Sequence, residues 1–142
     1  LQKYMGQVVR QRASSPKLQV FNNALLGAVA VGAGDTLASL RQQPQHWGRW
    51  VESAVGAELL ARHLTHSSTQ PCIHYWNDGQ REVDYVLAQG AGLLALEVKS
   101  GTHTGNVSGL DAFCAAHPAA RPLVLGTGGL PLELWFASEA AF

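Results

Sequence analysis

The sequence predicts an α/β fold with a mixed β-sheet flanked by helices, and three observations carry this prediction. Two nearly continuous apolar runs, 83–87 and 93–98, are typical of strands buried on both faces. Residues 89–92 separate the runs, and Gly90 suits the first central position of a type II′ turn in an antiparallel hairpin. Residues 45–66 show a wide apolar face at helical spacing, and helix and strand patterns alternate after them.

The chain divides into a helical lead-in segment, residues 1–44, and an α/β core, residues 45–142, within one structural domain. An asparagine can cap one lead-in helix, and Asp35 can cap a second, shorter one. The lead-in elements expected are a short helix at 2–12, a short strand or extended stretch at 17–21, a helix from Asn22 or Asn23 interrupted at Gly32 and Gly34, and a short helix ending near Pro44.

The core begins with the longest predicted helix, residues 45–66, on which Glu52 lies off the centre of the apolar face. Gly56 follows Glu52 by one turn and weakens the helix, which indicates either a neighbour or ligand that needs room or close packing on the sheet. The elements expected after it are a strand at 72–76, a turn at 77–79, the hairpin, a loop at 101–108, a helix at 109–117, a strand at 122–125, a loop at 126–129 and a helix at 132–141.

Composition restricts the classes of function. The net charge of the 142 residues is zero, which argues against a protein that coats nucleic acid by bulk electrostatics. Residues 1–71 carry seven Lys/Arg and three Asp/Glu, whereas residues 72–142 carry three and seven. This asymmetry suits a phosphate-bearing substrate, and it equally suits contact between the two halves.

The sequence also indicates the cellular compartment in which the protein is expected. It has no apolar run long enough to span a bilayer and no signal-peptide pattern, so we expect a cytoplasmic protein with no membrane partner. The two cysteines, Cys72 and Cys114, are expected to be free thiols. Because the chain begins at Leu1, we expect it to be a piece of a longer protein.

Charged residues interrupt the apolar hairpin runs. If Gly90 and Ala91 form the loop, Asp84 lies opposite Glu97, and alternation places both on the face that carries Lys99. Opposed carboxylates destabilise a hairpin unless a positive charge lies between them, and Lys99 and a divalent cation are the two candidates. The alternative is that the strand ends reach water and that Glu97–Lys99 is a weak surface pair. Three charges on one face of otherwise interior runs favour a functional site.

The residue types indicate metal-assisted chemistry. Carboxylates are the ligands that Mg²⁺ or Mn²⁺ prefers, so Asp84, Glu97 and Glu52 are the candidate metal ligands. A metal bound there can polarise a phosphate and activate water, while Lys99 can hold that water or stabilise charge on the transition state. We therefore expect these four side chains to converge and at least one carboxyl pKa to be raised.

The pattern of a helical Glu52, a strand Asp84 and Glu97-x-Lys99 on the next strand resembles the PD-(D/E)XK restriction-endonuclease-like superfamily. The Asp84–Glu97 spacing is similar to that of archaeal Holliday-junction resolvases. Val83 stands where the superfamily often has Pro. The resemblance implies a restriction-endonuclease-like core and Mg²⁺-dependent hydrolysis of DNA. The alternative function is a catalytically silent nuclease-fold module for DNA or protein recognition and assembly.

A second resemblance covers almost the whole chain. It involves Ser14–Leu18, Asn23–Leu26, Gly48–Glu52, Tyr75-Trp76, Arg81–Asp84 and Glu97–Lys99. These stretches resemble the carboxy-terminal domain of unknown function of bacterial and archaeal predicted AAA+ ATPases, although Asn22-Asn23-Ala24 stands where that family often has Asp-x-Gly. The resemblance implies an amino-terminal ATPase domain as a partner, and oligomers. ATP would bind outside this chain, because the sequence has no Gly-x-x-x-x-Gly-Lys-[Ser/Thr] motif.

Two further patterns are weaker evidence for a ligand site. His63, His66, Cys72 and His74 match no common zinc spacing, so structural or surface roles are favoured. Residues 126–129 (Gly-Thr-Gly-Gly) could cradle a phosphate, but without a lysine a plain strand–helix turn is favoured.

Overall fold

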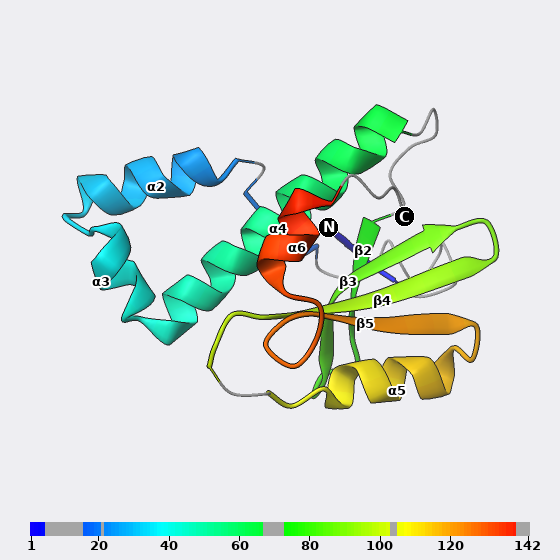
Figure 1. The fold of residues 1–142 in the computed structure, drawn as a ribbon. Coiled ribbons are helices and arrows are strands. Elements are labelled where there is room, and N and C mark those ends of the chain that lie inside the picture. Colours follow the sequence, from blue (N-terminus) through cyan, green and yellow to red (C-terminus); the bar gives the residue numbers. More distant parts are fainter. Residues whose placement is uncertain (5–15, 21, 67–72, 103–104, 139–142) are drawn as a thin grey trace.

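A five-stranded mixed sheet with helices on both faces forms the core of the protein in the computed structural model (Figure 1). The structure describes residues 1–4, 16–20, 22–66, 73–102 and 105–138. The strands are β1 (Gln2–Lys3), β2 (Ile73–Asn77), β3 (Glu82–Gln89), β4 (Gly92–Lys99) and β5 (Ala120–Gly126), and they lie in the sheet in chain order. β1–β2 and β4–β5 are parallel, while β2–β3 and β3–β4 are antiparallel. The predicted α/β class is confirmed.

The central hairpin has the predicted register. Its pairs run from Tyr85–Leu96 to Gln89–Gly92, so the numbers of opposed residues sum to 181 as the Gly90–Ala91 loop requires. Gly90 has a φ of 58°, a conformation that L side chains rarely adopt, which explains why glycine begins this tight turn.

β3 contains an irregularity that simple alternation did not predict. His74 pairs with Val86 and Trp76 pairs with Val83, so two residues of β3, Asp84 and Tyr85, lie opposite the single residue between the partners on β2. Such a bulge changes which face each following side chain occupies. Val83 and Val86 consequently belong to the same core cluster, although strict alternation would place them on opposite faces. The alternation used to predict the face of Asp84 is therefore interrupted at that residue.

The helices cover the two faces of the sheet in different ways. α4 (Pro44–His66) and α6 (Leu132–Ala137) lie over one face, and α5 (Ser108–Ala116) lies over the other (Figure 1). Each face has its own apolar cluster, whose burial supplies the main favourable term in folding. The cluster under α4 and α6 is Val55, Leu59, Tyr85, Leu96, Leu125 and Trp135, and the cluster under α5 is Val83, Val86, Ala95, Leu110 and Phe113.

Two lead-in helices, α2 (Asn23–Gly32) and α3 (Leu37–Arg41), lie beside α4 and away from the sheet (Figure 1). α2 carries no charged residue, and its Leu25 and Val29 side chains, one turn apart, are 61% and 73% exposed. None of the helices in the described ranges is long and apolar enough to cross a membrane.

Three predicted details of the elements need correction. The cap of α3 is Thr36 rather than Asp35, because the Thr36 side chain accepts the hydrogen bond from the backbone of Ser39. Gln2 and Lys3 form β1 rather than the start of a helix, because they pair with β2; residues 5–15 lie outside the described ranges. The last helix ends at Ala137, because the backbone of Ser138 is already extended.

Candidate active site

Asp84 and Glu97 lie just beyond the paired part of the central hairpin. The last pair on this side is Tyr85 with Leu96, and beyond it the Asp84 carboxylate accepts a hydrogen bond from the backbone nitrogen of Val98 at 2.9 Å. The two acidic side chains are only 15% and 13% exposed. The end of the hairpin therefore holds two carboxylates largely out of water, where ionisation is unfavourable without a compensating positive charge.

Lys99 provides one of these charges. Its Nζ atom lies 2.7 Å from Glu97 Oε1, in a pair with both side chains mostly buried. The second carboxylate oxygen of Glu97, Oε2, is buried and has no hydrogen-bond partner among the described residues. A buried acceptor of this kind is unfavourable, and it leaves a lone pair for a ligand.

The second positive charge is Lys17, a residue that sequence reasoning missed. Its Nζ atom lies 2.7 Å from Glu52 Oε1, 2.5 Å from Glu82 Oε1 and 3.9 Å from Asp84 Oδ1. Lys17 thus joins the helical Glu52 to the strand residues Glu82 and Asp84. Glu97, paired with Lys99, interacts electrostatically with Asp84 and with Glu52. The four predicted residues thus lie in one neighbourhood, to which the structure adds Lys17 and Glu82; we call Glu52, Glu82, Asp84 and Glu97 the carboxylate cluster.

Lys17 reaches the carboxylate cluster because residues 17–20 are fastened along α4. Gln19 donates a hydrogen bond to the Tyr85 hydroxyl, which in turn donates to the Glu52 carbonyl at 2.7 Å. Ser53 Oγ donates to the Val20 carbonyl at 3.1 Å.

Gly56 is the residue that makes room for this crossing. A β-carbon on Gly56 would overlap the Tyr85 hydroxyl and the Gln19 amide. The room that the sequence indicated beside Glu52 is therefore filled by neighbouring side chains.

The electrostatics of the carboxylate cluster agree with the predicted rise in at least one carboxyl pKa. Burial, with further contributions from Glu97 and Glu52, raises the pKa of Asp84 to about 7. Burial also raises the pKa of Glu97, although Lys99 opposes the rise. Burial alone would lower the pKa of Lys17, but its hydrogen bonds to Glu52 and Glu82 raise that pKa above its ordinary value. Lys17 therefore stays charged at neutral pH, whereas Asp84 titrates near it.

The donor set suits a hard divalent cation in its chemistry. Four carboxylates outnumber the two ammonium groups that contact them, and the unpartnered Oε2 of Glu97 adds a free oxygen. In the ranges that the structure describes, no three His, Cys, Asp or Glu side chains are grouped around one metal position. The cation held by Glu52 and Glu82 in this arrangement is Lys17.

The glycine-rich loop after β5 is a structural turn. The backbone nitrogens of Gly126, Thr127 and Gly129 donate to the carbonyls of Leu130, Lys99 and Gly126 at 2.7, 3.0 and 3.0 Å. These groups are engaged within the protein, so they do not point to a phosphate site. Cys114 is a free thiol as predicted, while Cys72 lies outside the described residues.

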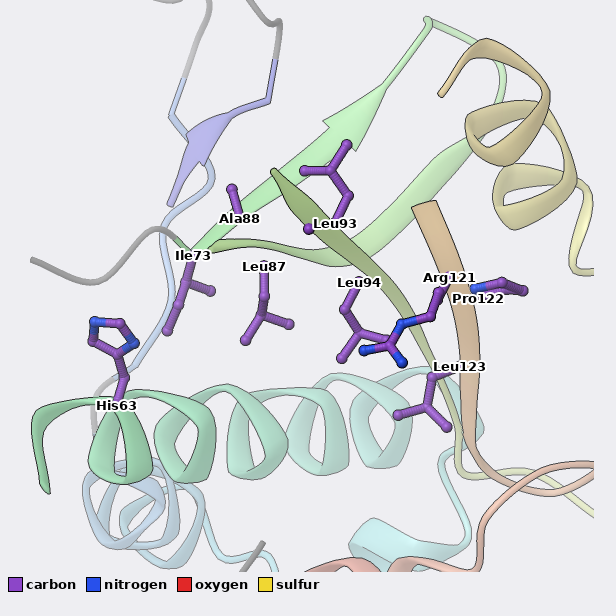
Figure 2. A pocket seen from close by; sticks show the side chains of 10 residues that line it. His63, Ile73, Leu87, Ala88, Leu93, Leu94, Arg121, Pro122 and Leu123 are labelled. Carbon is purple, nitrogen blue, oxygen red and sulfur yellow. The ribbon is translucent and has the colours of Figure 1, made fainter. Parts of the chain in front are cut away.

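Two hollows differ in their chemistry. A cavity of about 610 Å³ lies between the second half of α4 and the sheet (Figure 2). Its wall is mainly aliphatic, with His63 and Arg121 as the charged or titratable groups and no carboxylate. A second hollow, of about 510 Å³, is bordered by Lys17, Arg49, Glu52 and Glu82. The second hollow borders two members of the carboxylate cluster, Glu52 and Glu82, and its Lys17 and Arg49 make it the better candidate for a phosphate-bearing substrate.

The comparisons with known proteins give one match. Residues 47–137, from the first turns of α4 to the end of α6, match a family model described as a domain of unknown function (DUF4143). No curated protein and no solved structure matches the chain. The matched range contains the four predicted site residues and Glu82, whereas Lys17 lies before it.

Proposed function

This chain belongs to the DUF4143 family of domains of unknown function, and we propose that it is a metal-dependent nuclease domain that hydrolyses DNA phosphodiester bonds. One observation carries the proposal. Largely buried carboxylates from a helix and a hairpin converge with Lys99 beside them, and burial, with contributions from Glu97 and Glu52, raises the pKa of Asp84 to about 7. Perturbed titratable groups of this kind cluster at functional sites.

In the proposed site, Asp84, Glu97 and Glu52 would hold Mg²⁺ or Mn²⁺. When bound, the metal supplies Lewis-acid polarisation of the phosphate and lowers the pKa of a coordinated water. Burial raises the pKa of Asp84 to about 7 in the metal-free chain, so near neutral pH this carboxyl would lose its proton as it takes up the metal. The ammonium of Lys99, held 2.7 Å from Glu97, stabilises negative charge that develops on the phosphate.

DNA is the proposed substrate, and an amino-terminal AAA+ ATPase domain is the proposed partner in the same protein. The hollow beside the carboxylate cluster supports access of a phosphate backbone, because Arg49 is exposed along it. The resemblance to PD-(D/E)XK nucleases and to the carboxy-terminal domains of AAA+ ATPases supports both proposals. ATP binding is assigned to the partner domain, since this sequence has no phosphate-binding loop motif.

A cleavage assay tests the proposed activity. Branched, duplex and single-stranded DNA would each be incubated with the chain and Mg²⁺ or Mn²⁺. We expect cleavage that is lost in Asp84→Ala and Glu97→Ala but kept in Glu133→Ala, which removes an exposed carboxylate from α6. Absence of cleavage on all three substrates, or cleavage that persists in the first two variants, would contradict the proposal.

A second candidate function is a catalytically silent module for DNA or protein recognition and assembly. Two observations favour it: Lys17 already neutralises part of the carboxylate cluster, and α2 exposes Leu25 and Val29 on an uncharged helix. Exposed apolar surface of this kind is typical of contacts with another protein. Calorimetry with Mg²⁺ and Mn²⁺ separates the candidates. Binding that is lost in Asp84→Asn favours the nuclease, and absence of binding at millimolar metal in both the natural chain and Lys17→Met favours the module.

A further inference from the structure

Lys17 occupies the space that a cation bound by Glu52 and Asp84 would need. Its Nζ atom is within 2.7 Å of Glu52 Oε1 and within 3.9 Å of Asp84 Oδ1. An ammonium group and a divalent cation carry the same sign of charge, so they repel each other at this separation in a partly buried site. The two therefore cannot share these oxygens without a large unfavourable interaction.

We propose that Lys17 is a built-in competitor of the divalent cation, and that its ammonium regulates metal loading of the carboxylate cluster by occupying Glu52 and Glu82. The inference rests on the proposed metal site and adds its regulation. The Lys17 ammonium is paired with Glu52 and Glu82, and metal binding requires it to leave them.

The contacts of residues 17–20 allow the role of the Lys17 charge to be tested separately from the role of its backbone. Residues 17–20 are held by the backbone bond from Lys17 N to Leu1 O at 2.9 Å, by Gln19 on Tyr85, and by Ser53 on the Val20 carbonyl. None of these contacts uses the Lys17 ammonium. Replacing Lys17 by methionine, a side chain of similar length, therefore removes the competing charge and leaves the fastening groups in place.

The substitution also removes a favourable charge from Glu52, Glu82 and Asp84, so these carboxylates repel one another more strongly in the absence of metal. A divalent cation relieves that repulsion. We expect Lys17→Met to increase the affinity for Mn²⁺ by about tenfold or more, within the usual range of coupling between two ligands.

Isothermal titration calorimetry with Mn²⁺ on the 142-residue chain measures this effect. Arg121→Met is the matched control, because it removes one positive charge from an exposed residue of the edge strand β5. The proposal requires tighter binding in Lys17→Met and unchanged binding in Arg121→Met. Equal or weaker binding in Lys17→Met overturns the regulation while leaving the metal site intact. Absence of binding in every chain overturns the metal site itself.

A measurement on the natural chain covers the case in which Lys17→Met does not fold. With ¹⁵N-labelled lysine, the Lys17 ammonium signal reports whether this group leaves its carboxylate partners. Titration with Mg²⁺ should shift the Lys17 signal and leave that of Lys3, on β1, unchanged. Metal binding detected by calorimetry without a change at Lys17 overturns the competition.

Discussion

Replacing Asp84 by asparagine should make the stability of the protein less sensitive to pH. The Asp84 carboxyl has a pKa of about 7 in the folded chain against a reference value of 3.8. Because the folded pKa is raised, the folded state binds the proton more tightly than the unfolded state does. The stabilisation is complete below the unfolded pKa and is lost as the pH rises through the folded pKa.

The magnitude follows from the size of the shift. Each unit of pKa difference corresponds to about 1.4 kcal/mol, so the shift of Asp84 from 3.8 to about 7 corresponds to about 4 kcal/mol. The natural chain should lose this much free energy of unfolding, relative to Asp84→Asn, between about pH 4 and pH 7. Asparagine keeps an oxygen that can accept the hydrogen bond from Val98, so the local geometry is retained.

Urea denaturation of both chains across this pH range, without metal, measures the difference. Asp78→Asn is the control of opposite sign, because hydrogen bonds from the backbones of Gln80 and Arg81 lower the pKa of Asp78. Its removal should reduce stability at neutral pH and have less effect in acid. A difference between the natural chain and Asp84→Asn that stays constant across the range would refute the electrostatic reasoning.

Three further predictions concern packing and linkage. Gly56→Ala should lower the free energy of unfolding by about 1–3 kcal/mol, because the added β-carbon overlaps neighbouring side chains. Gly32→Ala, with open space around it, should not destabilise the protein, and urea denaturation compares the two variants. Arg62→Met should cost about 2–3 kcal/mol by the same measurement, because the buried guanidinium donates to the carbonyl of Trp135 at 2.7 Å. Calorimetry at pH 6 in buffers of different ionisation enthalpy should show that Mn²⁺ binding releases about one proton, since the metal displaces the proton of Asp84.

The features that the sequence predicted well depend on local signals. The hairpin register follows from the turn at Gly90, because a two-residue loop determines which residues lie opposite each other. The long helix follows from apolar periodicity, and it begins at Pro44, one residue before the predicted start. Asp84 and Glu97 lie near each other as the register predicted, although they lie just beyond its last pair, and the role of these residues and of Lys99 stays a prediction.

The features that were missed depend on distant partners. The bulge at Asp84 and Tyr85 reflects the pairing of β3 with β2, which the pattern of a single strand does not record. Lys17 lies 65 residues from Glu82, so no spacing rule connects them. The only sequence signal for Lys17 was its place in the Ser14–Leu18 stretch that resembles the ATPase-associated family.

The charges of the carboxylate cluster connect the two candidate functions. Four carboxylates face two ammonium groups, and the raised pKa of Asp84 means that one proton is also retained below about pH 7. Lys17 and that proton together carry two positive charges, the charge of one divalent cation. Replacing both by Mg²⁺ therefore leaves the net charge of the site unchanged, which makes the exchange electrostatically balanced. A silent module would keep Lys17 in place, and a nuclease would exchange it, so the position of this one ammonium group distinguishes the two functions.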